Sequence, residues 1–88
     1  MPTVDIPAPY TGPTQGTDRV RVDGETVRQC LEAVEARFPG FGPLVLDGKG
    51  KPHRFVRLFV NGKPAKPETR VEPEDVVGVL AGIAGGVW

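Results

Sequence analysis

Few side chains in this 88-residue sequence are of the types that do chemistry. The only cysteine, Cys30, lies on the apolar side of a predicted helix, and nothing nearby indicates the exposure or lowered pKa that a reactive thiol needs. The only histidine, His53, is close to Lys51 and Arg54, which favours a solvated basic patch over a general base. One Cys and one His do not make a zinc site, and no glycine spacing matches a phosphate-binding loop. We therefore expect neither an enzyme nor a metal protein.

The consecutive glycines Gly85 and Gly86 have a clearer chemical use. Two adjacent residues without Cβ atoms make a backbone thin enough to enter a narrow channel in another protein. Six extended residues from Ala81 to Gly86 would reach about 20 Å, enough to place a terminal carboxyl group in a partner's active site. A frayed, glycine-rich chain end is the alternative. The interpretation of Gly-Gly therefore depends on the fold that precedes it.

A second feature is the segment 48–67, which contains six basic residues and no acid. The whole chain has 11 Lys and Arg against 11 Asp and Glu, so this segment predicts a local electropositive surface, either solvated or used for docking. Phe55, Arg57 and Phe59 alternate along one predicted strand and would lie on one side of it. Aromatic residues and Arg are enriched in interface cores, so we predict a partner-docking face formed by Phe55, Arg57 and Phe59.

Composition limits the class of protein. A chain of this length supports one domain with one modest core. Its balanced charge predicts no nucleic-acid partner, and no apolar run approaches the ~20 residues that cross a membrane. The N-terminus does not resemble a secretory signal, and a single Cys fits a reducing compartment, so we expect a cytoplasmic protein.

One amphipathic helix is the clearest predicted element. Thr26 and Gln29 have the spacing of a capping box, and Pro39-Gly40 ends the pattern. Between these signals, apolar residues recur at spacings of three and four, which predicts a helix over residues 27–38.

Short alternating segments predict strands on both sides of this helix. They cover residues 3–6, 19–22, 55–60, 63–65 and 76–80, while 8–17 and 41–53 are expected to be connections. Asn61-Gly62 predicts a tight hairpin turn. The order of elements predicts an α+β fold of the β-grasp type, a mixed sheet of four to five strands around one main helix. The Phe55, Arg57 and Phe59 side of the sheet would face away from that helix.

Over nearly its whole length, the sequence resembles the MoaD/ThiS family of ubiquitin-like sulfur-carrier proteins, and it is most similar to the CysO-like branch. The most specific matches are His53-Arg54-Phe55-Val56 at the start of the central strand and Ala84-Gly85-Gly86 near the end. Further matches are Val4-Asp5-Ile6-Pro7, the helix region Thr26 to Gly40, Phe59-Val60-Asn61-Gly62 and Pro73-Glu74-Asp75-Val76-Val77.

This resemblance implies a role as a protein-bound sulfur donor in sulfur metabolism, such as amino-acid or cofactor biosynthesis. A ubiquitin-activating-type enzyme would use ATP to adenylate the Gly86 carboxyl group, which a sulfur source would convert to a thiocarboxylate. The tail Ala84, Gly85 and Gly86 would enter partner active sites, including that of a sulfur-accepting synthase. The carrier itself would bind no cofactor.

The sequence departs from the family pattern because Val87 and Trp88 follow the second glycine. An amide at Gly86 offers no carboxylate to adenylate. Some relatives carry such short extensions, which a JAMM-type metalloprotease removes. We therefore predict a β-grasp domain over 1–80, a Gly-Gly tail over 81–86, and an extension over 87–88 that is cleaved between Gly86 and Val87.

Two other functions remain open at this point. The chain could be a ubiquitin-like modifier that is joined through Gly86 to lysines of target proteins. Alternatively, it could be a non-covalent interaction domain whose function depends only on the Phe55, Arg57 and Phe59 face.

Overall fold

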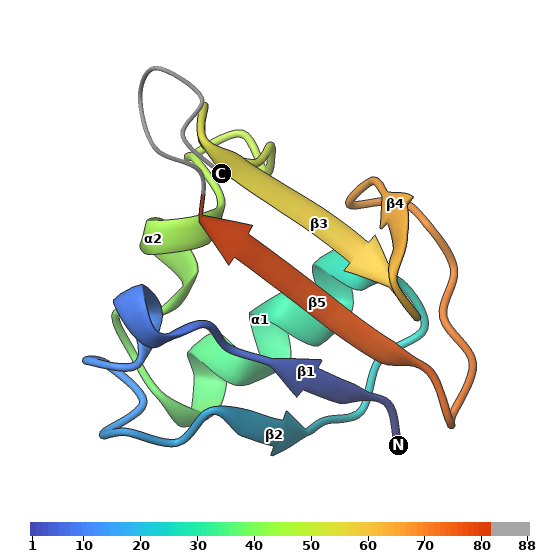
Figure 1. Ribbon diagram of the computed structural model, residues 1–88, viewed down its shortest axis with the longest axis horizontal. Helices are drawn as coiled ribbons and strands as arrows, with labels where there is room; N and C mark the ends of the chain where they lie inside the picture. The colour runs from blue at the N-terminus through green and yellow to red at the C-terminus, as the bar shows by residue number, and fades with distance from the viewer. Residues whose placement is uncertain (82–88) are drawn as a thin grey trace.

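The computed structural model describes residues 1–81 as one five-stranded mixed sheet packed on a helix (Figure 1). The elements are β1 (Thr3–Asp5), the 3₁₀ helix η1 (Ala8–Tyr10), β2 (Arg19–Arg21), α1 (Val27–Arg37), α2 (Gly42–Val45), β3 (Val56–Val60), β4 (Lys63–Ala65) and β5 (Val76–Ala81). The strand order is β2-β1-β5-β3-β4. The central pair β1 and β5 is parallel, and the other pairs are antiparallel. This arrangement confirms the predicted β-grasp fold.

Helix α1 begins at the predicted capping box. The Thr26 hydroxyl accepts a hydrogen bond from the Gln29 backbone N–H at 3.1 Å. The Gln29 side chain reaches back one residue beyond Thr26 and accepts from the Glu25 N–H at 2.8 Å. These bonds satisfy two backbone donors at the start of the helix. The helix ends at Arg37, and Phe38 caps it by donating its N–H to the Val34 carbonyl.

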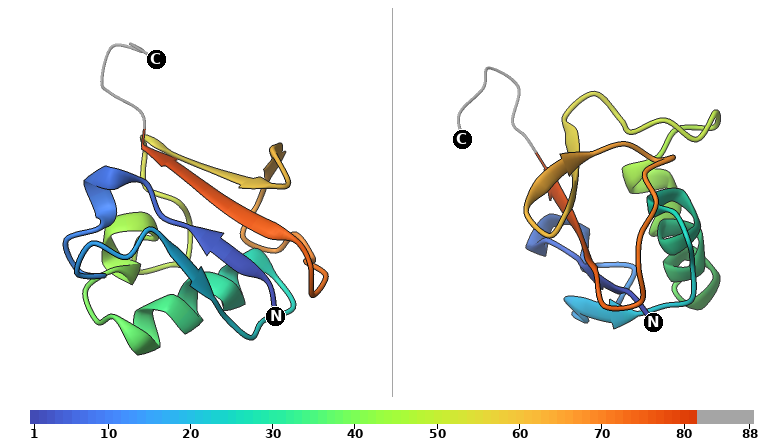
Figure 2. Two further views of the ribbon diagram at one scale, coloured as in Figure 1. Left: turned by 60° about the horizontal axis from the view of Figure 1, so that its bottom comes forward. Right: turned by 90° about the vertical axis from the view of Figure 1, so that its right-hand side faces the viewer.

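The core lies between α1 and one face of the sheet. Figure 2 shows α1 on one side of the sheet, where the strands contribute Val4, Val20, Val56, Leu58, Val77 and Val79 to the core. The helix contributes four fully buried residues, Val27, Cys30, Leu31 and Val34. Strands β1, β2, β3 and β5 therefore each have one side in the core and one side that faces away from α1, as their alternating sequences predict.

The connection predicted over 41–53 contains an element that the sequence pattern did not indicate. Helix α2 spans Gly42–Val45, and both Phe41 and Val45 are fully buried. Pro43 is tolerated because it stands in the first turn, where its missing N–H has no partner within the helix.

The hairpin between β3 and β4 has the predicted turn. Asn61 and Gly62 have φ angles of 51° and 81°, the left-handed conformation that this dipeptide favours. The Asn61 side chain also accepts from the Val76 N–H at 2.9 Å and donates to the Asp75 carboxylate at 2.9 Å. This turn therefore holds the start of β5 as well as joining its own two strands.

Candidate functional site

The outer face of the sheet, opposite α1, carries two of the three residues predicted to dock a partner. Arg57 and Phe59 alternate with the buried Val56 and Leu58, so they point away from the core. Phe55 differs from the prediction because β3 begins only at Val56.

Phe55 lies in the turn before β3, where the residue is 41% exposed. The Arg54 guanidinium lies over this ring at 5.4 Å from its centre. Phe55 is therefore not part of the alternating strand face that was predicted. The docking role of all three residues stays a prediction.

The outer face is hollowed where Gly78 lies between two larger residues. In the strand register Gly78 is paired with Asp5 on β1 and with Phe59 on β3. A groove of about 420 Å³ follows this part of β5, and its lining includes Ile6, Phe59 and Leu80. A side chain at Gly78 would occupy the hollow, because a Cβ there would lie 3.5 Å from the Phe59 Cβ, an ordinary contact distance.

Gly78 is a sequence signal for this groove, but composition and periodicity alone do not reveal it. A glycine inside a strand has no side chain to pack and often marks a close approach by another backbone or a ligand. Gly78 interrupts an apolar run in the predicted last strand. Which residues it faces depends on the pairing of β5 with β1 and β3, and these strands are far apart in the sequence.

Charges surround the groove on two sides. Asp5 and Arg19 form an ion pair with 2.9 Å between Oδ1 and Nε, and both side chains are exposed, so the pair is weak. Arg57 is exposed and pairs in register with Leu80. Within residues 1–81 its guanidinium has no carboxylate or carbonyl partner. The groove thus has a mainly apolar lining, and the exposed Arg57 lies next to its lining residue Leu80.

Strand β5 connects this groove to the Gly-Gly segment. The strand ends at Ala81, which pairs with Val56 at the start of β3 (Figure 1). Gly86 is the fifth residue after Ala81 in the sequence. The predicted tail and processing residues, Ala84, Gly85, Gly86 and Val87, lie outside the described residues.

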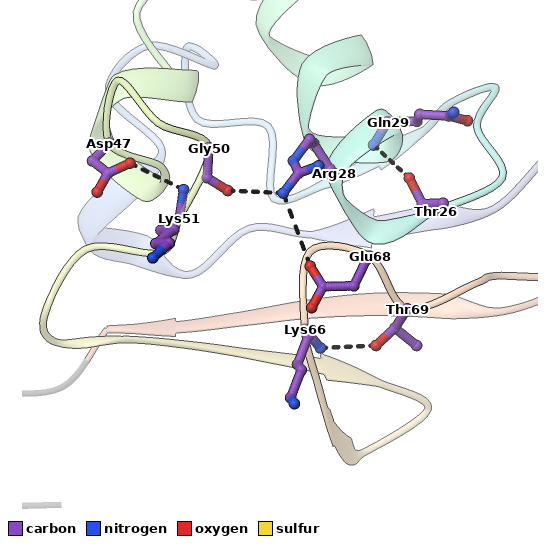
Figure 3. A network of polar contacts seen from close by, with 9 residues as sticks. All are labelled: Thr26, Arg28, Gln29, Asp47, Gly50, Lys51, Lys66, Glu68 and Thr69. Atoms are coloured by element: carbon purple, nitrogen blue, oxygen red, sulfur yellow. Dashed lines mark hydrogen bonds and ion pairs between the residues drawn. The ribbon is translucent and has the colours of Figure 1, made fainter.

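Two acids, Asp47 and Glu68, flank the basic segment 48–67, whose electropositive surface stays a prediction. The Asp47 carboxylate accepts from the backbone N–H groups of Lys51 at 3.0 Å and Lys49 at 2.8 Å, and these bonds lower the pKa of Asp47. Arg28 lies between two loops (Figure 3). Its Nη2 is 3.5 Å from the Gly50 carbonyl oxygen and 3.9 Å from the Glu68 carboxylate. Asp47, just before the segment, therefore lies close to Lys49, whereas Glu68, just after it, pairs with Arg28 of α1.

The contacts of Cys30 and His53 indicate that both residues have structural roles. Cys30 is fully buried, and burial, followed by the nearby charge of Asp23, raises the pKa of its thiol. His53 is exposed, and its Nε2 lies 2.6 Å from the Pro43 carbonyl, so this nitrogen carries the proton and donates it. Its backbone N–H also donates to the Val45 carbonyl. His53 thus connects the loop between α2 and β3 to α2 through these two hydrogen bonds.

Residues 1–81 contain no group of three or more His, Cys, Asp or Glu side chains that could hold a metal ion. Over the same residues, no helix has the length and apolar character that crossing a membrane requires.

Comparison with known proteins places this geometry in a family. The family model described as the ThiS family matches residues 9–86, which is most of the chain. The chain belongs to the ThiS family. A search of curated protein sequences found no match.

Solved structures agree with this assignment. The crystal structure of the Amycolatopsis orientalis BexX/CysO complex contains a chain 30% identical to this one, with a TM-score of 0.89 and coverage of 98% of this chain and all of that chain. Mycobacterium tuberculosis CysO is 28% identical, with a TM-score of 0.86 and coverage of 94% of this chain and all of that one. SAMP1 from Haloferax volcanii is 23% identical, with a TM-score of 0.77 and coverage of 97% and 98%, and its likeness concerns the fold alone.

The ThiS family member described here therefore has the ubiquitin-like β-grasp fold of the CysO-like sulfur carriers. The family consists of small carrier proteins rather than enzymes. This agrees with a described structure in which the one thiol is buried and the one imidazole holds a loop.

Proposed function

We propose that this chain is a sulfur carrier whose Gly86 carboxyl group is activated and converted to a thiocarboxylate. The observation that carries the proposal is that the Gly-Gly motif follows the last strand of a β-grasp domain. The family match extends through Gly86, and β5 leads from the middle of the sheet to Ala81, five residues before it. A folded domain that ends in a thin segment of this length would present one carbonyl carbon to a partner enzyme.

The chemistry requires activation because a carboxylate is a poor electrophile. A carboxylate oxygen of Gly86 attacks the α-phosphate of ATP, and pyrophosphate leaves. A sulfur nucleophile then attacks the carbonyl carbon of the mixed anhydride, and AMP leaves, so that a thiocarboxylate remains. A ubiquitin-activating-type enzyme would bind the ATP and supply the catalytic groups. The thiocarboxylate would then serve a sulfur-accepting synthase in amino-acid or cofactor biosynthesis.

The residues after Gly86 make processing a necessary step. In the sequence as it stands, the Gly86 carbonyl belongs to the amide bond with Val87 and has no free carboxylate oxygen. Hydrolysis of this one bond would create the carboxylate, and a JAMM-type metalloprotease is the class of enzyme expected to perform it.

The partner would dock on the outer face of the sheet. Phe59 forms a wall of the groove, and Arg57 provides an exposed cation beside it. A partner bound there would have the end of β5 within reach, because Leu80 lines the groove and Ala81 ends the strand. Phe55 lies outside the groove lining and would contribute less.

A second candidate is a ubiquitin-like modifier. Its support is the likeness in fold to the small archaeal modifier protein 1 (SAMP1) of Haloferax volcanii. A modifier would likewise use a Gly86 carboxyl group that a partner enzyme adenylates. The two candidates diverge after activation, because a modifier is transferred to a lysine amine instead of receiving sulfur.

Mass spectrometry separates the candidates. Residues 1–86, incubated with an adenylating enzyme, ATP and a sulfide donor, should gain about 16 Da as sulfur replaces oxygen. Isopeptide adducts of the same polypeptide in cell lysate, without that gain, would favour the modifier. Replacing Gly86 with Ala should impair both covalent functions and leave a purely non-covalent interaction domain unaffected.

A further inference from the structure

A second groove lies on the helix side of the molecule, between α1, α2 and the loop that follows α2. Both helices are on the same side of the sheet (Figure 2). The volume of this helix-side groove is about 330 Å³, small for a ligand pocket, so it suits one or two side chains. Its lining includes Leu31, Glu32 and Glu35 from α1, and Pro43, Leu46 and Asp47 from α2 and the loop.

The lining of the helix-side groove is mainly apolar. Leu31 is fully buried at its base, Leu46 is half-buried and Pro43 is exposed. Leu44, the next residue of α2 after Pro43, is 39% exposed and adds to the apolar surface of this helix. The aliphatic part of a long side chain packs well on a surface of this kind.

The charges of the helix-side groove all have one sign. Its lining contains the carboxylates of Glu32, Glu35 and Asp47 and no Lys or Arg side chain. Within residues 1–81, neither of the two ion pairs uses any of these three acids. The groove therefore combines apolar surface with negative charge that the described residues leave without a cation.

The nearby cations have other contacts. Arg28 precedes Glu32 by one helical turn, but its guanidinium lies near the Gly50 carbonyl and the Glu68 carboxylate. The His53 imidazole bonds the Pro43 carbonyl. A cation from outside the described residues would thus complete the charge pattern of the groove.

Two of the three carboxylates are held in place by backbone bonds. Glu35 Oε1 accepts from the Gly42 N–H at 2.7 Å and from the Gly40 N–H at 3.1 Å. The Asp47 carboxylate is fixed by the loop N–H groups described above, which lower its pKa and keep it ionised. Acids that are already ordered lose little side-chain entropy when a cation binds them.

We propose that the helix-side groove binds a segment of a partner protein that presents an arginine side chain next to apolar residues. The aliphatic part of the arginine would lie along Pro43 and Leu46, and its guanidinium would bond the carboxylates. Arginine suits this site better than lysine, because its planar guanidinium has five donors that can bridge several carboxylates.

The helix-side groove and the outer face of the sheet lie on opposite sides of the molecule (Figure 2). A partner in the helix-side groove would not compete with an adenylating enzyme on the outer face, so both could bind at once. The proposed contact does not depend on the proposed function.

A pair of peptides tests the proposal on the full chain. Acetyl-Leu-Arg-Leu-amide, added to the isotope-labelled protein, should shift the amide NMR signals of Glu35, Leu46 and Gly48. The same peptide with citrulline in place of arginine keeps the shape and lacks the charge, so it should bind several-fold more weakly. Added salt should weaken the binding of the arginine peptide, because the attraction is between exposed charges.

Gly48→Lys should block the site. Gly48 lines the groove, and a Cβ there would meet no atom within 4 Å, so the variant can fold and place its own ammonium group among the acids. Binding of the arginine peptide should fall several-fold. Gly12→Lys is the matched control, since a Cβ at Gly12 also has open space and Gly12 lies outside the groove. It should leave binding unchanged, and circular dichroism would check that both variants are folded.

Several results would overturn the proposal. These are the absence of shifts at the groove, equal binding of the two peptides, and equal effects of the two lysine variants. If spermine shifts the groove signals and the arginine peptide does not, the occupant is a small polyamine. If the groove signals move with protein concentration alone, the occupant is a second copy of the chain.

Failure of the inference and failure of the proposed function are distinguishable. Formation of a thiocarboxylate on residues 1–86, with no binding of the arginine peptide, would remove only the inference. Binding of this peptide, with no thiocarboxylate on residues 1–86, would remove only the function.

Discussion

Gly78 on β5 lies directly opposite Phe59 on β3, and a Cβ at Gly78 would be 3.5 Å from the Phe59 Cβ. Because Gly78 has no side chain, the outer face of the sheet is hollow beside the half-buried Phe59. Asp5 lies on the other side of Gly78, so the hollow is bounded by an aromatic residue and an acid. This relationship defines the surface on which we propose that a partner enzyme docks.

Phe59 should matter more than Phe55 for recognition by the adenylating enzyme. In residues 1–86, Phe59→Ala removes a wall of the groove and should raise the KM for the carrier about ten-fold, as expected for an aromatic residue at an interface centre. Phe55→Ala is the matched control because it removes the same ring outside the groove, and it should change KM little. Steady-state adenylation assays would measure both constants, and equal effects of the two variants would contradict the assignment of the groove.

Several parts of the fold could be predicted because their signals are local. The capping box at Thr26 and the left-handed turn at Asn61-Gly62 each depend on residues within a few positions of one another. Helix α2 was not predicted, since its stability depends on the burial of Phe41 and Val45 against distant elements. Glycine and proline in this stretch would by themselves favour a loop.

The candidate site was predictable only in part for a related reason. Alternation along one strand was sufficient to place Arg57 and Phe59 on the outer face, but not to fix the start of β3 after Phe55. The groove joins β1, β3 and β5, and the position of Gly78 opposite Phe59 follows from pairing between strands separated by many residues. Alternation fixes which side of a strand is buried, but it does not say which residue of a distant strand lies opposite a given position.

The cap of α1 should contribute measurably to stability. Thr26→Ala removes the hydroxyl that accepts from the Gln29 N–H, and the free energy of unfolding should fall by about 1 kcal/mol. Thr26→Ser keeps the hydroxyl and should retain most of the stability. Urea unfolding followed by circular dichroism would compare the two variants, and an equal loss in both would show that the hydroxyl is not responsible.

The Asp75 carboxylate should make stability depend on acid pH. Hydrogen bonds from the Glu72 N–H and then from the Asn61 side chain lower the pKa of Asp75 below its ordinary value. A lowered folded-state pKa means that the native state binds the proton less readily than the unfolded state does. The stabilisation is therefore present above the unfolded pKa of about 3.9 and is lost as the pH falls through the folded pKa.

Asp75→Asn provides the comparison for this prediction. The wild-type protein should be more stable than the variant at neutral pH, and the difference should shrink as the pH falls below about 4. Thermal unfolding at a series of pH values would measure it. A difference that stays constant across this range would show that ionisation of Asp75 does not contribute.

Processing should remove the residues after Gly86 in a single cut. Incubation with a JAMM-type metalloprotease should lower the mass of the chain by about 285 Da, the sum of the Val and Trp residues released by hydrolysis of one peptide bond. A metal chelator should prevent the loss, and only the shortened chain should then be adenylated. A Gly86→Pro chain is a suitable control, because proline at this position should block the cut while leaving residues 1–81 unchanged. Adenylation of the wild-type chain with Val87 and Trp88 still attached would disprove the requirement for processing, since an amide at Gly86 has no carboxylate oxygen to attack ATP.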